Sequence, residues 1–382
     1  MSETFPRFPL PEAVAEAARS MAPAYLRRRL TRARTPFIDG ETVTFTYVGS
    51  PRAVRVVHFM AQFPKIPDME RFESTDLWSV TVKLPQRTRM EYQLEIEWDH
   101  ETQRTIDPLN TRIAHDPFGA NSVAHALGYV DPMWTSPSVD AARGDVETIE
   151  IDSKALGGKR SHSVYVPAGF PAAAPYPAVF LHDGSDLIQY AALTTSLDSL
   201  IGAGAMRPTV VVLMDPVDRN REYMALPAHG RSIVDEIVPG VTSEFQISSE
   251  PRHRVIGGAS LGAVASLATA WRHPDVFGAM VLLSGTFITE LGGPWHRGPE
   301  LQPVVDFMHR FHSGPGLPTP MAWVACGAFE ALSTDNMAFV SRLRLAGIDV
   351  SYREPLDGHH WQNWRNNLGD ALRELFPAPV HH

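Results

Sequence analysis

A serine between glycines, in the run 258–262 (GASLG), is the stretch of the chain best suited to chemistry. A strand-like run, 254–257, precedes it, and a helix-like run, 264–271, follows it. Glycines at both flanks let the chain turn sharply from strand to helix without a side-chain collision. Such a turn exposes the serine hydroxyl at a helix N-terminus, whose dipole favours negative charge. The spacing predicts that Ser260 is a nucleophile.

A serine nucleophile needs a general base, and two adjacent histidines near the end of the chain could serve. His359 and His360 follow Gly358, in a loop predicted between the last strand and the last helix. A neutral imidazole, with an ordinary pKa of ~6.5, can take the hydroxyl proton and return it to the leaving group. We predict His359 as the base, with His360 as the competing candidate.

Two carboxylates could orient the imidazole and stabilise its charged form. Glu330 and Asp335 both follow the run 321–327, which is predicted as the penultimate strand. Glu330 is preferred because it is nearer to the strand end. Asp335 is equally suited to capping the next helix. A dyad without a strong acid remains a third possibility.

The negative oxygen that forms during acyl transfer needs two backbone N–H donors. The first is predicted at Leu261, the residue after the nucleophile. The second is expected in the loop 182–186 (HDGSD), which follows a strand predicted at 178–181. Its glycine allows the backbone to approach a substrate oxygen closely. We therefore assign the second donor to Gly184 or Ser185.

The second part of the chain alternates between strand and helix patterns. An antiparallel pair is predicted at its start, followed by buried parallel strands with helices in the intervals. This pattern predicts an α/β fold with a doubly wound, mostly parallel sheet. The predicted strands are 147–151, 162–166, 178–181, 209–214, 255–257, 279–283, 321–326 and 348–352, and the predicted helices are 189–203, 229–242, 262–273, 300–312, 335–346 and 361–375.

The first part of the chain has a different pattern of predicted elements from the second. Residues 11–33 read as one helix rich in Ala, Leu and Arg, and four strands of β-branched and aromatic residues follow, as in a β-sandwich. An irregular arm is expected over 107–119, and a Pro- and Ser-rich linker over 131–138. The domain boundary is placed near residue 140, giving domains 1–140 and 141–382. The four strands are predicted at 42–48, 54–59, 77–84 and 91–97.

Composition narrows the class of protein. The chain of 382 residues is 44% hydrophobic and 20% charged, as expected for a globular protein with an ample core. A net charge of −9 argues against a nucleic-acid surface. No apolar run reaches the ~20 residues of a membrane span, and the N-terminus lacks the pattern of a signal peptide. With the single Cys326, predicted as a buried strand thiol, these features predict a cytoplasmic protein with no membrane partner.

Several motifs, taken together and in order, resemble the enterochelin (enterobactin) esterases of the esterase D-like branch of the α/β-hydrolases. The resemblance covers most of residues 150–375 and places the base at His359, although the usual Gly-His-Asp-Trp reads Gly-His-His-Trp here. The segment 40–130 resembles the N-terminal β-sandwich of these ferric siderophore esterases. The motifs are 181–184 (LHDG), 218–222 (DRNRE), 235–239 (DEIVP), 258–262, 272–278 (RHPDVFG), 284–286 (SGT) and 358–365 (GHHWQNWR).

The resemblance also implies a set of substrate-binding residues. Arg219 and Arg221 match the acidic-ligand side of the family's cleft, although a surface salt bridge with Glu222 would explain them equally. In the family, the strand after the elbow often ends in Ser-Gly-Ser followed by tryptophans. This chain has 284–287 (SGTF) there, so its aromatic lining is altered. The complete set of expected substrate-binding residues is Asp183, Arg219, Arg221, His360 and Trp361.

The leading hypothesis is a serine carboxylic-ester hydrolase that works through an acyl-enzyme and needs no metal or organic cofactor. The resemblance implies a small-molecule ester, such as a ferric siderophore, as substrate. Feruloyl and other acyl esterases, and acyl transfer to another alcohol, are alternatives on the same scaffold. A non-catalytic binding protein is the rival from another class. The oligomeric state is left open.

Overall fold

The computed structural model describes residues 4–33, 35–138, 141–170, 174–292 and 297–378. Within it the chain forms two compact units. Unit 1 runs to Val130 and also includes the short segments 328–330 and 355–360, while the rest of the chain from Asp131 forms unit 2. The domain boundary near residue 140 stays a prediction, and residues 139 and 140 lie outside the described part. Membership of the two short segments in unit 1 was not predicted.

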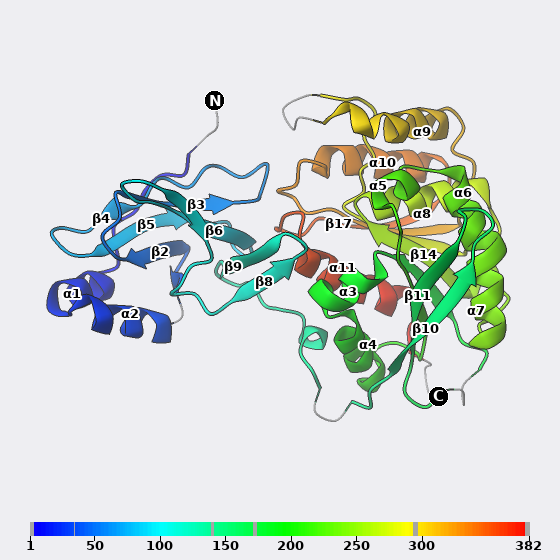
Figure 1. Ribbon diagram of the computed structural model, residues 1–382, viewed down its shortest axis with the longest axis horizontal. Helices are drawn as coiled ribbons and strands as arrows, with labels where there is room; N and C mark the ends of the chain where they lie inside the picture. Colours follow the sequence, from blue (N-terminus) through cyan, green and yellow to red (C-terminus); the bar gives the residue numbers. More distant parts are fainter. Residues whose placement is uncertain (1–3, 34, 139–140, 171–173, 293–296, 379–382) are drawn as a thin grey trace. The chain divides into compact units, whose positions relative to one another are not determined.

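Unit 2 is built on one eight-stranded sheet (Figure 1). Its order is β10-β11-β13-β12-β14-β15-β16-β17, with β10, β11 and β13 paired antiparallel and all later neighbours parallel. The predicted strands of this half are all present. Their bounds are β10 Asp145–Asp152, β11 Lys159–Val166, β12 Ala178–His182, β13 Val210–Met214, β14 Arg254–Ala259, β15 Ala279–Leu283, β16 Met321–Ala325 and β17 Asp349–Arg353.

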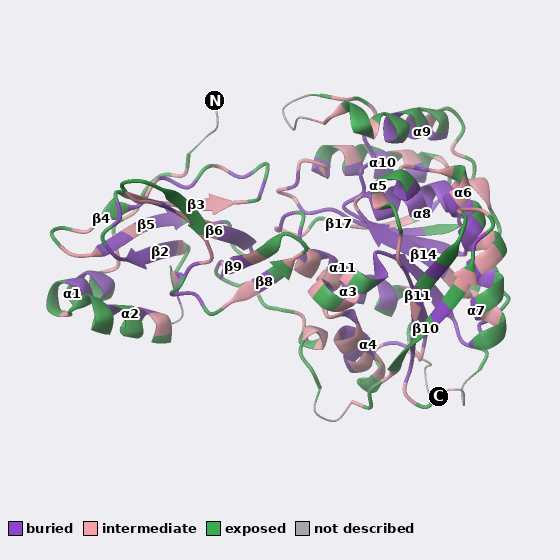
Figure 2. Cartoon of the chain, in the orientation of Figure 1, coloured by how far each residue is buried: buried purple, intermediate pink, exposed green. Residues whose placement is uncertain are grey.

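Helices cover both faces of this sheet, because its central strands are apolar on both sides. Figure 2 shows the central strand β14 as buried. On β14, Ile256 joins the core on one face and Val255 joins the core on the other. The helices are α3 Gly184–Ala191, α4 Leu193–Gly202, α5 Arg219–Tyr223, α6 Pro227–Arg231, the π-helical η2 Ser232–Ile237, α7 Val238–Glu244, α8 Leu261–Arg272, α9 Gln302–Ser313, α10 Ser333–Leu345 and α11 Trp361–Leu375, with 3₁₀ turns η1 Met133–Thr135, η3 Pro251–His253 and η4 Pro299–Leu301.

The parallel arrangement fixes where the loops of unit 2 gather. Neighbouring parallel strands end at the same edge of a sheet, and in open α/β sheets ligands bind outside these carboxyl ends. The loop at residues 183–185 follows β12, Ser260 follows β14, and the loop at 284–287 follows β15. The strand order thus brings the predicted nucleophile and the predicted oxyanion loop to one edge.

Unit 1 contains two antiparallel sheets, β1-β2-β5-β4 and β3-β6-β9-β8, with β7 paired to β6. One apolar core takes side chains from both sheets, among them Phe45 of β2 and Tyr92 of β6, which meet edge to face. The elements are α1 Glu12–Ser20, α2 Pro23–Arg32, β1 Phe37–Asp39, β2 Thr42–Val48, β3 Ala53–His58, β4 Glu70–Arg71, β5 Leu77–Lys83, β6 Arg89–Glu97, β7 Thr102–Thr105, β8 Ile113–Asp116 and β9 Gly119–His125.

Two expectations for the first part of the chain were wrong. The single helix predicted over 11–33 is two helices, because Pro23 lacks the N–H and the backbone freedom to continue α1 and instead begins α2. The arm predicted as irregular over 107–119 contains β8 and the start of the antiparallel hairpin β8–β9. No helix in the described residues is long and apolar enough to cross a membrane.

The carboxyl of Asp107 gives unit 1 a testable pH dependence. Its oxygens accept hydrogen bonds from the Tyr92 hydroxyl (2.7 Å) and the Leu109 N–H (2.8 Å), and burial raises its pKa to about 6. A pKa raised in the folded state gives stability that is complete below the unfolded pKa of ~3.9 and is lost as pH rises through the folded value.

We expect the free energy of unfolding to fall by up to about 3 kcal/mol between pH ~4 and ~6 on account of this group. Asp107→Asn should remove that slope, and urea unfolding across this pH range measures it. Asp99→Asn, at an exposed carboxylate, is the control and should keep the slope. An unchanged slope in Asp107→Asn would contradict the assignment.

Candidate active site

Ser260 occupies a strained turn between β14 and α8. Its backbone angles, φ 57° and ψ −118°, lie in a region that non-glycine residues rarely adopt. Neighbouring backbone holds it there, because the Ser260 N–H donates to the Leu283 carbonyl (2.9 Å) and the Ser260 carbonyl accepts from the Thr286 N–H (3.2 Å). The Ser260 hydroxyl lies 3.4 Å from that of Thr286. This is the strand–turn–helix context in which a G-x-S-x-G serine acts as a nucleophile.

The two glycines of the motif are required by close packing. A Cβ on Gly258 would lie 2.8 Å from the backbone of Gly262 and 3.0 Å from the Cβ of His182. A Cβ on Gly262 would also lie 3.0 Å from the Cβ of His182. The end of β12 therefore approaches the turn closely enough that a side chain at either glycine would displace it.

In the loop after β12, the two candidates for the second oxyanion donor differ in the partners of their backbone N–H groups. The Ser185 N–H donates to Asp215 Oδ1 (2.8 Å) and its hydroxyl donates to Asp215 Oδ2 (2.6 Å), so this amide already has a carboxylate acceptor. Gly184 is the first residue of α3, where backbone N–H groups lack intrahelical acceptors. A Cβ on Gly184 would lie 2.5 Å from the backbone of Leu213, so glycine is needed at this position.

Asp183 and Arg219, both predicted to bind substrate, bind each other. The guanidinium of Arg219 forms two hydrogen bonds of 2.7 Å with the two carboxylate oxygens of Asp183, which is buried. Asp183 itself has a left-handed backbone (φ 60°), and its N–H donates to the Tyr223 hydroxyl (3.1 Å). The carboxylate of Asp183 thus fixes Arg219 and the turn before Gly184. The Arg219 side chain is 35% exposed and keeps part of its surface available.

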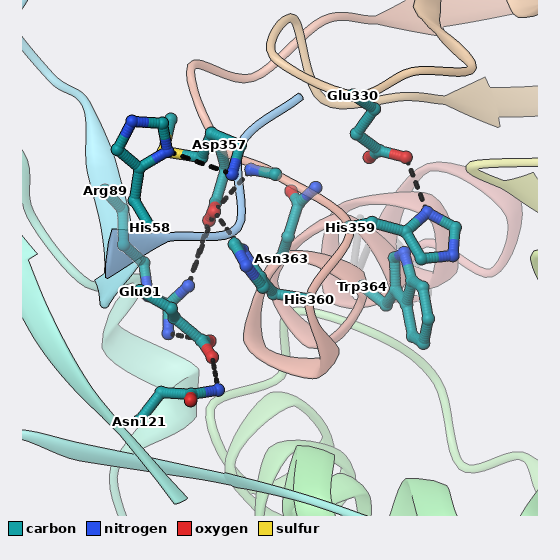
Figure 3. A network of polar contacts seen from close by, with 12 residues as sticks. His58, Arg89, Glu91, Asn121, Glu330, Asp357, His359, His360, Asn363 and Trp364 are labelled. Carbon is teal, nitrogen blue, oxygen red and sulfur yellow. Dashed lines mark hydrogen bonds and ion pairs between the residues drawn. The ribbon is translucent and has the colours of Figure 1, made fainter. Parts of the chain in front are cut away.

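The predicted base and acid form a pair in unit 1 (Figure 3). His359 Nδ1 lies 2.7 Å from Glu330 Oε2, and the Glu330 side chain is fully buried while that of His359 is 37% exposed. An ionised carboxylate only accepts hydrogen bonds, so Nδ1 carries the proton and Nε2 is left as the basic nitrogen. This is the arrangement of an imidazole oriented by a carboxylate.

The competing residues have other partners. Asp335 forms an ion pair with Arg297, which accounts for it without a role as the triad acid. His360 is buried, and its Nδ1 lies 3.0 Å from Asp357 Oδ1. Burial alone would lower the pKa of His360, but the carboxylates of Glu91 and Asp357 raise it. His360 thus belongs to a buried ionic cluster, and it also lines the same cavity as His359, so its contact with a substrate stays a prediction.

The remaining predicted substrate-binding residues lie in unit 2. Arg221 is exposed and lies in the first turns of α5, next to a small surface cavity that Arg160 and Glu222 also line. Trp361 begins α11 and packs against Trp364 and Tyr190. Their contact with a substrate stays a prediction. Among the described residues, no group of three or more His, Cys, Asp or Glu side chains could hold a metal ion.

A buried polar chain beneath the turn was not predicted from the sequence. His182 and His229 meet through their Nε2 atoms at 3.0 Å, and Glu222 binds Arg160 at 2.7 Å while lying 3.6 Å from His229. Burial, together with the nearby His229, lowers the pKa of His182 well below its ordinary value and keeps it neutral. The motifs containing His182 and Glu222 were noticed, but nothing in the sequence showed that they meet.

Comparison with known proteins places the chain among esterases. A family model described as putative esterase matches residues 153–375. An iron(III) enterobactin esterase of Dickeya dadantii is 28% identical over 252 residues, which cover 62% of this chain and 55% of the relative. The iron(III) enterobactin esterase of Escherichia coli K12 is 23% identical over 344 residues, 82% of each chain. This chain therefore spans about half of the Dickeya relative's length but most of the Escherichia relative's.

A solved structure shows the same fold. The ferric enterobactin esterase from Salmonella typhimurium matches with a TM-score of 0.76 at 20% identity, covering 91% of this chain and 98% of that one. At this identity the likeness concerns the fold, which is mixed α/β in both proteins. The resemblance to the enterochelin esterases that the motifs predicted is confirmed, and the chain belongs to the putative esterase family.

Proposed function

We propose that the protein hydrolyses carboxylic esters with Ser260 as nucleophile, His359 as general base and Glu330 as the acid that orients it. The observation that carries the proposal is the strained, half-buried position of Ser260 at the carboxyl end of β14. The Glu330–His359 pair supports it, because both residues follow strands, β16 and β17, that belong to the same parallel sheet as β14. Family membership supports the reaction class.

The chemistry follows from these roles. Ser260 Oγ attacks the ester carbonyl carbon while His359 Nε2 takes the hydroxyl proton. His359 then gives that proton to the leaving alcohol as the carbon–oxygen bond breaks. Water attacks the acyl-enzyme, losing a proton to His359, and the acid is released as the proton returns to Ser260. Glu330 holds the Nδ1–H of His359 and stabilises its charge during both steps.

The oxyanion of each tetrahedral intermediate needs two donors aimed at one point. We assign these to the N–H groups of Leu261 and Gly184. Each is the first residue of a helix, so its amide has no intrahelical acceptor and lies at the positive end of a dipole. Ser185 is not chosen, because its N–H already donates to Asp215.

The relatives and a cavity in unit 1 support a proposal for the substrate class. The Dickeya and Escherichia relatives described above are named iron(III) enterobactin esterases, so we propose a ferric siderophore or a related small-molecule ester as substrate. A cavity of about 420 Å³ in unit 1 is lined by His359 and by the exposed aromatic side chains of Phe59 and Phe118. Such rings suit planar aromatic groups of a substrate.

Three finer predictions remain proposals alongside this function. Unit 1 is proposed to be a β-sandwich of the enterochelin esterase type, supported by two sheets that share one core. The aromatic lining after β15 is proposed to differ from the usual one of the family. The aromatic residue present there, Phe287, is buried and stacks on Phe339 with 3.8 Å between ring centroids. A cytoplasmic location also stays a prediction.

Replacing the nucleophile tests the reaction. Ser260→Ala should lower turnover of p-nitrophenyl butyrate by about 10⁴-fold or more and abolish labelling by a fluorophosphonate probe. Ser341→Ala, at an exposed serine of α10, is the control and should behave as wild type. Wild-type protein that neither turns over the ester nor reacts with the probe would sink the enzymatic proposal and favour a binding protein. Relative rates on a ferric siderophore, a feruloyl sugar and simple esters then identify the substrate class.

The assignment of the acid has a matched pair of variants. Glu330→Gln should lower kcat by about 10²- to 10⁴-fold, because the amide no longer stabilises the charged imidazole. Asp335→Asn should leave kcat within about twofold of wild type, because its partner is Arg297. Steady-state kinetics with thermal unfolding of each variant separates activity from stability. Loss of activity only in Asp335→Asn would reverse the assignment.

A further inference from the structure

Residues 328–330 and 355–360, which carry the proposed acid and base, lie within the region matched by the esterase family model but belong to unit 1. They pair with each other through backbone hydrogen bonds, from Ala328 N–H to the Pro355 carbonyl (2.8 Å) and from Phe329 N–H to the Asp357 carbonyl (3.3 Å). We call 328–330 the acid segment and 355–360 the base segment. Their backbones are thus paired with each other within the same compact unit as the two N-terminal sheets.

The base segment is attached to unit 1 through a buried arginine. Arg89, fully buried at the start of β6, donates its backbone N–H to the Leu356 carbonyl (3.1 Å). Its Nη1 lies 3.3 Å from Asp357 Oδ2, and Asp357 Oδ1 accepts the Gly358 N–H (2.7 Å). Arg89 therefore fixes the backbone on the residues directly preceding His359.

A second layer of contacts orients Arg89 itself (Figure 3). Its Nη2 lies 2.7 Å from Glu91 Oε1, and Glu91 Oε2 accepts a hydrogen bond from Asn121 Nδ2 (3.0 Å) on β9. His360 completes the cluster through Asp357. The planar guanidinium can address Glu91 and Asp357 in two fixed directions at once, which a lysine ammonium cannot do. We call Arg89, Glu91, Asn121, Asp357 and His360 the arginine cluster.

The acid segment is attached separately. Gln62 Nε2 donates to the Glu330 carbonyl (2.8 Å), and the Gln62 N–H donates to the Phe329 carbonyl (3.1 Å). The ring of Phe329 packs edge to face on Phe63, with centroids 4.6 Å apart. Two independent sets of contacts from unit 1 therefore hold the two halves of the Glu330–His359 pair.

We propose that the N-terminal part of the chain is a positioning device for catalysis, in which Arg89 and Gln62 set the geometry of the Glu330–His359 pair. The inference rests on the proposed function, in which His359 is the base. A general base displaced by about 1 Å can cost about 10²-fold in rate, so these contacts affect kcat more than substrate binding. The role of unit 1 then extends beyond recognising substrate.

The test compares two arginines of one sheet. Arg89→Lys keeps the positive charge but loses the planar guanidinium that binds Glu91 and Asp357 at the same time. Arg55→Lys is the matched control, because Arg55 on β3 also binds several carboxylates, Asp68, Glu95 and Glu97, and its described contacts do not reach 328–330 or 355–360. Each is measured for kcat and KM on p-nitrophenyl butyrate and for the downfield NMR signal of the His359 Nδ1–H, assigned with His359→Gln.

We expect Arg89→Lys to lower kcat by about tenfold or more, to change KM by less than about threefold, and to lose the imidazole signal through faster exchange. Arg55→Lys should retain both the kcat and the signal of wild type. If Arg89→Lys matches Arg55→Lys in kcat and in signal, the proposal is overturned. Loss of the signal without any Ser260-dependent turnover in wild type would uphold positioning while rejecting the proposed reaction.

A milder variant covers the case in which Arg89→Lys does not fold. Gln62→Met removes the hydrogen bond to the Glu330 carbonyl while keeping the length of the side chain. Under the proposal kcat falls severalfold and the imidazole signal broadens in the folded variant. A folded Gln62→Met protein with wild-type kcat and an unchanged signal would overturn the inference on its own.

Discussion

The backbone conformation of Ser260 is the constraint on which the rest of the site depends. A residue at φ 57° and ψ −118° is unfavourable by itself, and it persists only where its surroundings over-determine it. Here the surroundings are two backbone hydrogen bonds, with Leu283 at the end of β15 and Thr286 in the loop after it, and the absence of side chains at Gly258 and Gly262. The sheet order accounts for both. On one side of β14, β15 provides the Leu283 carbonyl, and on the other side His182 of β12 lies so close that both positions must be glycine. The fold thus maintains a serine hydroxyl in a position that an isolated segment would abandon.

Two buried ionic networks stiffen the parts of the chain that carry the candidate site. In unit 2, Arg160 and Glu222 continue through His229 to His182, whose Cβ is packed against both glycines of the turn. In unit 1, the arginine cluster fixes the backbone before His359. Burying such charges costs desolvation energy, so they are weak evidence for stability. Their fixed directions instead define the position of neighbouring backbone, which is what a catalytic geometry requires.

Much of the fold could be predicted, because its signals are local. Runs of apolar residues marked the buried parallel strands, and the glycine pattern marked the turn at Ser260. The two failures have different origins. Pro23 divides a helix that reads as continuous in composition, and the hairpin β8–β9 lacks a strong strand pattern because its residues are largely polar or small. Pairing with β6 stabilises that hairpin, and such long-range pairing leaves no mark within the segment itself.

The sequence by itself predicted the nucleophile, a mostly parallel sheet from the alternation of strands and helices, and two short lists of candidates for base and acid. Only the tertiary structure showed which partner each candidate has. Glu330 and Asp335 are equivalent as carboxylates near a strand end, and their partners, His359 and Arg297, are distant in sequence. The same holds for Ser185, whose amide is occupied by Asp215, and for Arg89, which reaches Asp357 from the other end of the chain. Partner choice depends on contacts between remote segments, and residue type and spacing carry no information about those contacts.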